Sequence, residues 1–222
     1  MNKKITIIGP FNTGTNLMQK VITSSFVDKD SNIKISLIPN DKIIWKHSID
    51  LEKLKILCET PNLYIIVMYR NLYSWINSMF KAKYDLKFSR IDDPVVFRGA
   101  DKSVRQYKNI IDVFNTWYTN YKKLLEKYEN IVFLDYIKVV DKVNGFKYIN
   151  QKIDRFNMRL YNEELYFNCL EKPAKFHGKP VKNSQEASEK YELDKNKIKN
   201  EIMKYKNLRE EINYDLINYY EK

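Results

Sequence analysis

The segment from Ile5 to Ile22 constrains the fold more than any other part of this chain. It reads ITIIGPFNTGTNLMQKVI: an apolar run stops at Gly9, a short turn ends at Gly14, and apolar residues then recur at helical spacing. This order predicts a buried strand, a tight turn, and a helix that packs back on the strand. Such a turn directs backbone N–H groups and the positive end of a helix at one point, which suits phosphate or sulfate.

The spacing of Gly9 and Gly14 is that of a Walker A loop, but the residues that follow differ from it. Thr15 and Asn16 stand where a Walker A loop has Lys and then Ser or Thr. The missing Lys is the charge that reaches the terminal phosphates of ATP or GTP. The loop therefore suits an anion other than an ordinary nucleotide triphosphate. The alternative is the plain strand–turn–helix that begins any α/β domain.

Length and composition limit the class of protein. The 222 residues suffice for one sizeable α/β domain, which we assign to residues 1–222, and 44% hydrophobic with 30% charged residues is typical of a soluble globular protein. No apolar run approaches the ~20 residues that span a membrane, and the N-terminal run is too short for a signal peptide. With only Cys58 and Cys169, we expect no disulfide framework, no metal site, no membrane partner and a cytoplasmic location.

The net charge of +11 comes from lysines spread along the whole chain. A dispersed excess is typical of a solvated surface, so we do not expect a nucleic-acid partner. A second reading of the same charge is that it steers a polyanionic ligand into a cleft.

The two strands predicted after the first helix are Lys34 to Ile38 and Ile43 to Lys46, separated by a Pro-Asn-Asp turn. The second of them delivers His47 to its end, where ligands bind in open parallel sheets. A helix from Leu51 to Leu57 follows. His47 is one of only two histidines, and we weigh a catalytic role for it evenly against a surface or packing role.

The strongest predicted strand is Leu63 to Tyr69, which is apolar almost throughout, as expected for a central parallel strand. Arg70 follows it directly, and a helix then runs from Asn71 to Phe80. An Arg at the end of a central strand can grip a phosphate with two hydrogen bonds, and Ser78 on the next helix could share that load. The alternatives are a surface ion pair for Arg70 and a surface hydroxyl for Ser78.

The rest of the chain completes a predicted α/β fold, in which a central parallel sheet is flanked by helices. We expect an irregular loop or lid from Lys83 to Ser103, a long amphipathic helix from Val104 to Tyr128, and a strand from Ile131 to Leu134. The C-terminal third, beyond Gly145, reads as helices interrupted by one basic loop from Lys172 to Ser184.

Together, these segments resemble the PAPS-dependent sulfotransferases, which use 3′-phosphoadenosine 5′-phosphosulfate (PAPS) and have a P-loop NTPase-like fold. In that family the first loop wraps the 5′-phosphosulfate and has a Gly-Thr pair before the helix, as Gly14 and Thr15 stand here. An Arg after a central strand and a Ser eight residues on bind the 3′-phosphate, and Arg70 and Ser78 have that spacing. The resemblance covers the chain as far as the helix that carries Ser78.

The resemblance implies a set of site residues and no metal. The implied cofactor contacts are Asn12, Thr13, Gly14, Thr15, Asn16, Arg70, Ser78, Lys179 and Lys182. His47 stands where many members carry a catalytic base. Asn12 replaces a Lys that often stabilises the leaving group, and Lys46 could substitute for it as a second catalytic residue. Adjacent side chains of an extended segment point to opposite faces, so Lys46 and His47 would need a bend to act together.

The resemblance thus implies a transferase that moves a sulfuryl group from PAPS to a hydroxyl or amine acceptor on a glycan, a protein or a metabolite, and releases the desulfated product PAP. One alternative is a P-loop nucleotide kinase or NTPase, because the strand that ends before Asp135 resembles a Walker B element. Another is a non-catalytic binding protein with a degenerate sulfotransferase fold, suggested by Asn12 and the net positive charge.

Overall fold

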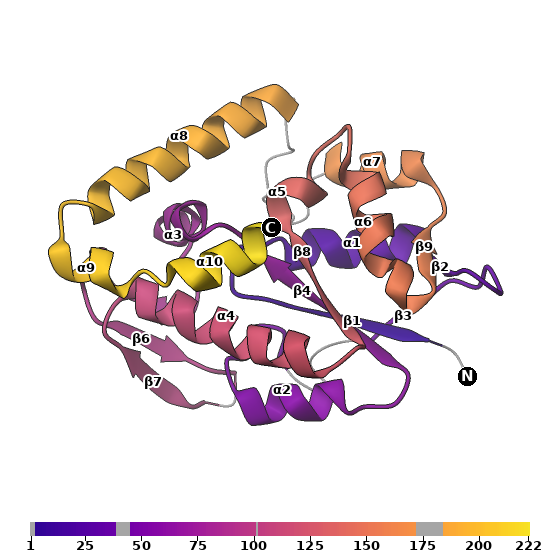
Figure 1. The fold of residues 1–222 in the computed structure, drawn as a ribbon, viewed down its shortest axis with the longest axis horizontal. Helices are drawn as coiled ribbons and strands as arrows, with labels where there is room; N and C mark the ends of the chain where they lie inside the picture. Colours follow the sequence, from indigo (N-terminus) through magenta and orange to yellow (C-terminus); the bar gives the residue numbers. More distant parts are fainter. Residues whose placement is uncertain (1–2, 39–44, 101, 172–183) are drawn as a thin grey trace.

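The computed structural model of the protein describes residues 3–38, 45–100, 102–171 and 184–222. Its centre is a four-stranded parallel sheet with strand order β3-β1-β4-β8 (Figure 1). The strands are β3 Ser36–Leu37, β1 Lys4–Ile8, β4 Leu63–Tyr69 and β8 Ile131–Asp135. The predicted α/β fold with a central parallel sheet and flanking helices is confirmed.

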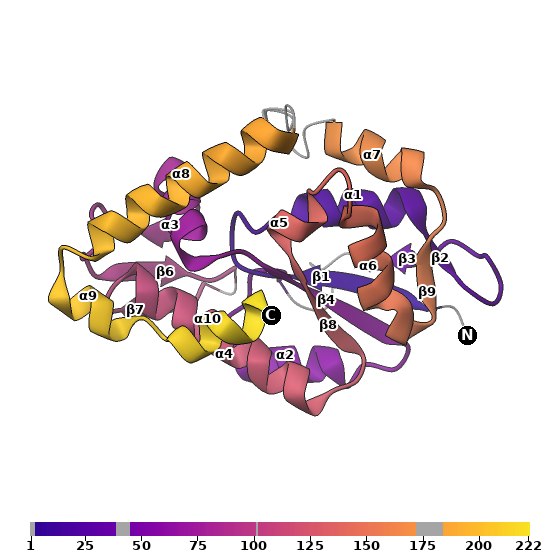
Figure 2. The same cartoon turned by 45° about the horizontal axis from the view of Figure 1, so that its top comes forward.

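Alternate side chains of the central strands enter two separate cores, one on each face of the sheet. On β4, Ile65 and Val67 point into the first core, while Ile66 and Met68 point into the second. The first core is covered by α2 Leu51–Cys58, α3 Leu72–Lys81, α4 Ile110–Lys127 and α10 Tyr214–Glu221. The second is covered by α1 Thr15–Ser25, α6 Gly145–Ile153 and α7 Glu163–Glu171 (Figure 2). Because both faces are covered, the strands are apolar almost throughout.

Two small antiparallel sheets flank the central one. The first joins β2 Phe26–Asp28 to β9 Met158–Leu160, and the second has the order β5-β6-β7. The remaining elements are β5 Leu86–Lys87, β6 Val95–Arg98, β7 Val104–Tyr107, α5 Tyr136–Val139, η2 Asp154–Phe156, α8 Ser184–Ile202 and α9 Lys206–Glu211. None of the helices within the described ranges is long and apolar enough to cross a membrane.

The prediction of an irregular loop from Lys83 to Ser103 was wrong, and so was the start of the long helix. That segment holds β5 and β6, and Val104 to Tyr107 adds β7 to the same sheet. The helix begins at Ile110 because the side chain of Asn109 accepts hydrogen bonds from the N–H groups of Ile111 and Asp112. Strands β5, β6 and β7 have only two to four residues each, which is too short for a clear sequence pattern, so pairing decides their structure.

Three further boundaries differ from the predictions. The strand expected over Lys34 to Ile38 is limited to Ser36–Leu37. A strand was also expected over Ile43 to Lys46, of which residues 43–44 lie outside the described residues. The chain from Trp45 to Ser48 forms a turn, which a 2.8 Å hydrogen bond from Ser48 N to Trp45 O closes. The C-terminal third is mainly helical, but it also contributes β9.

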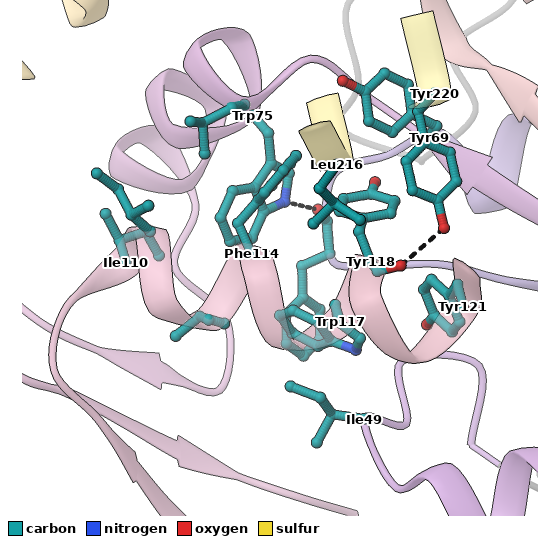
Figure 3. Close-up of a cluster of buried hydrophobic side chains, with 14 of the residues drawn as sticks. Ile49, Tyr69, Trp75, Ile110, Phe114, Trp117, Tyr118, Tyr121, Leu216 and Tyr220 are labelled. Atoms are coloured by element: carbon teal, nitrogen blue, oxygen red, sulfur yellow. Dashed lines mark hydrogen bonds between the residues drawn. The ribbon is translucent and has the colours of Figure 1, made fainter. Parts of the chain in front are cut away.

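Helix α4 carries a cluster of buried aromatic side chains (Figure 3). Phe114, Trp117 and Tyr118 are buried, as their helical spacing predicted. The polar atoms of the cluster are satisfied: the Tyr118 hydroxyl donates to the carbonyl of Met68, and the Tyr220 hydroxyl donates to the carbonyl of Tyr118 at 2.8 Å. These bonds attach the C-terminal helix α10 and helix α4 to the end of the central sheet.

Replacing Phe114 by Ala tests the importance of this cluster. Phe114 is fully buried and packs on Trp75 and Tyr118, so its removal leaves a cavity in a close-packed core. We expect the free energy of unfolding to fall by about 3–5 kcal/mol. The control is Ile56→Ala on α2, where the side chain is 63% exposed and the loss should stay within about 0.5 kcal/mol. Equal losses in chemical denaturation would contradict this assignment of the core.

Candidate functional site

The loop from Gly9 to Gly14 joins β1 to α1 and leaves the positive end of α1 uncapped by any side chain. Gly14 is the N-cap residue, with φ 90°, and the first turn of α1 contains no acidic residue. A Cβ at Gly14 would lie 2.5 Å from the ring of Tyr136, so both the backbone angle and the space require glycine. The N–H groups at this helix end and its dipole favour an anion.

The threonines of the loop support its shape. The Thr13 hydroxyl donates a 2.7 Å hydrogen bond to the carbonyl of Pro10, and it is fully buried. Thr15 is also buried, in the first turn of α1. The Thr13 hydroxyl is thus committed to the loop itself, so a ligand here would meet mainly backbone N–H groups.

Lys46 and His47 both reach the loop, because the turn from Trp45 to Ser48 bends the chain. The Lys46 carbonyl accepts a hydrogen bond from Gly9 N at 3.0 Å, and its ammonium donates to Asn16 Oδ1 at 2.5 Å. Nδ1 of His47 lies 2.7 Å from the carbonyl oxygen of Gly9. The turn therefore supplies the bend that Lys46 and His47 need in order to reach the same loop.

The side chain of Arg70 leaves the end of β4 and contacts the loop. Its Nη1 donates to the carbonyl of Asn12 at 2.9 Å, and its Nε donates to the Ser74 hydroxyl at 3.2 Å. The guanidinium carbon lies 5.0 Å from the centre of the Tyr136 ring. Arg70 is half-buried, and within the described ranges no carboxylate forms an ion pair with it. A cation in this state favours a bound anion.

The side chain of Asn12 is directed at the C-terminal end of helix α3. Its amide nitrogen donates to the carbonyls of Ala82 at 2.9 Å and Ser78 at 3.2 Å. Its backbone has φ 60°, a conformation that Asn tolerates better than most residues. Asn12 thus shapes the loop, and its side chain is occupied.

Ser78 lies near the loop without offering it a free hydroxyl proton. Its hydroxyl donates to the carbonyl of Trp75 at 2.7 Å, one helical turn earlier. A phosphate bound there would require the hydroxyl to rotate. Asn12 nevertheless connects both predicted anion contacts, since it accepts from Arg70 and donates to the Ser78 carbonyl.

Tyr191 on α8 is a site residue that the sequence reading did not identify. Helix α8 packs along α3 (Figure 2), and the Tyr191 side chain reaches Ser74, the residue that also contacts Arg70. Burial raises the pKa of Tyr191 to about 12, and its hydrogen bond with Ser74 opposes that rise. The only signal in the sequence is a single aromatic residue within a highly charged segment.

Asp135 ends β8 at the same edge of the sheet. Its side chain is buried and accepts a hydrogen bond from Ile137 N at 3.1 Å, which caps α5. Its own N–H donates to the Tyr148 hydroxyl at 2.9 Å. Burial raises the pKa of Asp135 to about 6, outweighing the opposing hydrogen bond from Ile137 N and the charge of Lys138.

The structure brings together most of the predicted site residues at the carboxyl end of the sheet. Three side chains reach the Gly9–Gly14 loop there: Lys46, His47 and Arg70. Ser78 lies beside them. Lys179 and Lys182 lie outside the described residues. Among the residues that the structure describes, no group of three or more His, Cys, Asp or Glu side chains could hold a metal ion. The arrangement can bind an anion and supplies one imidazole next to it.

Replacing Asp135 by Asn tests its raised pKa. Because the folded protein binds this proton more tightly than the unfolded chain, the free energy of unfolding falls as pH rises from about 4 to about 6. Asn removes the charge and keeps an oxygen for Ile137 N. We expect the free energy of unfolding of the variant to match that of the wild type near pH 3 and to exceed it by about 3 kcal/mol near pH 7. This difference corresponds to the rise of the Asp135 pKa from 3.8 to about 6.

The control for that experiment is Asp28→Asn, measured by urea denaturation over the same pH range. The hydrogen bond from Lys3 lowers the pKa of Asp28 to about 2, so its charge stabilises the folded protein above pH 4 and this contribution disappears toward pH 2. The two variants should therefore show opposite effects. A difference at Asp135 that does not change with pH would contradict its assignment.

No protein-family description matches this chain, and no curated protein is similar enough to it to count as a match. The sulfotransferase resemblance therefore depends on the sequence motifs alone. Any statement about function has to be argued from the residues that the fold brings together at the carboxyl end of the central sheet.

Proposed function

We propose that this protein is a sulfotransferase that moves a sulfuryl group from PAPS to a hydroxyl or amine acceptor. The observation that carries the proposal is Arg70: a half-buried guanidinium at the end of a central strand, held against the Gly9–Gly14 loop with no ion-pair partner among the described residues. A ligand with two anionic groups would match two positive features of the site, the N-terminus of α1 and Arg70. One would bind at the N-terminus of α1 and the other beside Arg70.

Lys46 supports the same proposal. Its ammonium contacts Asn16 in the first turn of α1, where the helix dipole disfavours a positive charge. An anion bound at this helix end would attract the Lys46 ammonium and offset its repulsion from the helix dipole. Lys46 also replaces, from a different segment, the positive charge that Asn12 does not supply. It would stabilise the charge that develops on the leaving phosphate.

His47 is the proposed general base. A carbonyl oxygen can only accept, so the contact with Gly9 O requires the proton of the neutral ring to be on Nδ1. The lone pair is then on Nε2, which is the form that can take a proton from an acceptor. The acceptor oxygen would attack sulfur, the bond from sulfur to the 5′-phosphate would break, and PAP would leave with that electron pair. The acceptor proton would pass to Nε2 of His47.

The main alternative is a P-loop kinase or NTPase, and Asp135 is the observation that favours it. Its place at the end of β8 suits a Walker B carboxylate. However, the carboxylate is buried and already accepts the hydrogen bond that caps α5, which leaves it less accessible to a metal ion. Tighter binding of Mg-ATP than of PAP, lost in Asp135→Asn, would favour this alternative. PAP binding without transfer would favour a non-catalytic binding protein.

Binding of PAP to Arg70→Gln tests the proposal. The substitution removes a charged donor from the bound phosphate, so we expect calorimetric titration to give a 10- to 100-fold weaker affinity than for the wild type. The matched control is Arg90→Gln, because Arg90 pairs with Asp92 on an exposed surface, and its affinity should stay within two-fold. Arg70→Lys keeps the charge and should lose less. Failure of the wild type to bind PAP would refute the proposal.

His47→Gln separates binding from chemistry. Gln can keep a donor toward Gly9 O but cannot act as a base, so we expect PAP affinity to stay within three-fold. The transfer of radiolabelled sulfate from PAPS to a panel of phenol, sugar and peptide hydroxyls should fall by about 10²–10⁴-fold. Transfer at the wild-type rate in this variant would exclude His47 as the base.

A further inference from the structure

Three surface cavities differ in the charges of their walls. A cavity of about 510 Å³ at α10 contains Lys122 and Lys222, which are balanced by Asp215 and Glu221. A cavity of about 280 Å³ contains Arg90, balanced by Asp92 and Glu201. A third cavity has no acidic side chain among its described lining residues. These are Phe133, Lys138, Tyr148, Gln151, Lys152 and Lys222, and the cavity measures about 490 Å³.

The third cavity, which we call the β8 cavity, is assembled from four elements. Its floor is Phe133 on the edge strand β8, and its walls come from α5, α6 and the end of α10. These elements lie together in both views (Figures 1 and 2). Because they are distant in sequence, only the fold brings the lysines together.

The lysines of the β8 cavity are held by aromatic rings. The Lys152 ammonium lies 4.7 Å from the ring centre of Phe133 and 5.9 Å from that of Tyr148. Lys138 lies 5.8 Å from the Tyr148 ring. Within the described ranges, neither lysine forms an ion pair with a carboxylate. Cation–π contacts of this kind contribute only about 0.5–2 kcal/mol. The buried Asp135, which interacts with the charge of Lys138, is not among the residues that line the cavity.

The two lysines also affect each other. Burial and the charge of Lys138 lower the pKa of Lys152, which is the direction expected when like charges are crowded. A negative group between them would relieve this repulsion. The cavity supplies further donors as well: the Tyr148 hydroxyl accepts from Asp135 N, which leaves its own proton for a ligand, and Gln151 carries an amide.

We propose that the β8 cavity binds a phosphate or sulfate group carried by a larger ligand, at a site separate from the Gly9–Gly14 loop and Arg70. Lys138 and Lys152 would hold the anionic group, with the Tyr148 hydroxyl as a third donor. The volume of about 490 Å³ is in the range of small-molecule pockets and exceeds what an inorganic oxyanion fills. The remainder of the ligand would then lie against Phe133 and Tyr148.

An NMR titration of backbone amides tests this site. Inorganic phosphate, and in a second series inorganic sulfate, is added to the full chain at constant ionic strength. We expect saturable shifts for residues 133–152 in both series. In Lys152→Gln and Lys138→Gln, dissociation constants fitted to these residues should rise at least ten-fold. If only one anion gives saturation, the chemical group of the ligand is identified.

Two variants serve as controls in the same titration. Lys122→Gln removes a lysine from the charge-balanced cavity at α10. Lys122 pairs with Glu126, and its removal should leave the fitted constants within two-fold. Arg70→Gln should also leave them unchanged, whether or not the protein binds PAP. Shifts that stay linear, or constants equal in the wild type and Lys152→Gln, would overturn the proposal. Shifts confined to the Gly9–Gly14 loop would also overturn it.

Discussion

Asn12 makes the interactions on which the candidate site depends. Its carbonyl accepts from Arg70 Nη1, and its side-chain amide donates to the carbonyls of Ala82 and Ser78. One residue therefore connects the loop after β1, the end of β4 and the last turn of α3. Its backbone is left-handed, with φ 60°, a conformation that Asn tolerates better than most residues. The position that first suggested a lost lysine is thus a structural junction.

Positive charge gathers around this junction, and it is balanced incompletely. Arg70, the ammonium of Lys46 and the uncapped end of α1 all approach the loop. Asp135, on the neighbouring strand, is buried with a raised pKa and caps α5. Because its pKa is about 6, Asp135 is mostly ionised at pH 7 and loses its charge as the pH falls below about 6. The contacts of Arg70 and Lys46 hold these positive charges at one edge of the sheet within the protein itself.

The sequence predicted the parts of the fold that are governed by local pattern. The strands that begin at Ile5 and Leu63 were recognised because both of their faces are buried. The long helix was found, but its start was placed before Asn109, since the short strand β7 reads as exposed polar sequence. Strands β5 and β6 were missed, and a loop from Lys83 to Ser103 was predicted instead, because strands of two and four residues are too short to show a clear pattern and are stable only when paired.

The sequence alone determined that a glycine-bounded turn, Arg70 and His47 follow buried strands, and parallel strands bring such residues to one edge. Only the tertiary structure decided how these side chains are used. In the folded protein the Asn12 side chain contacts the end of α3, the Lys46 ammonium lies at the start of α1, and Tyr191 lies beside Ser74. These contacts join residues far apart in the chain, and their geometry depends on helix packing and on one tight turn, neither of which has a periodic signal in the sequence.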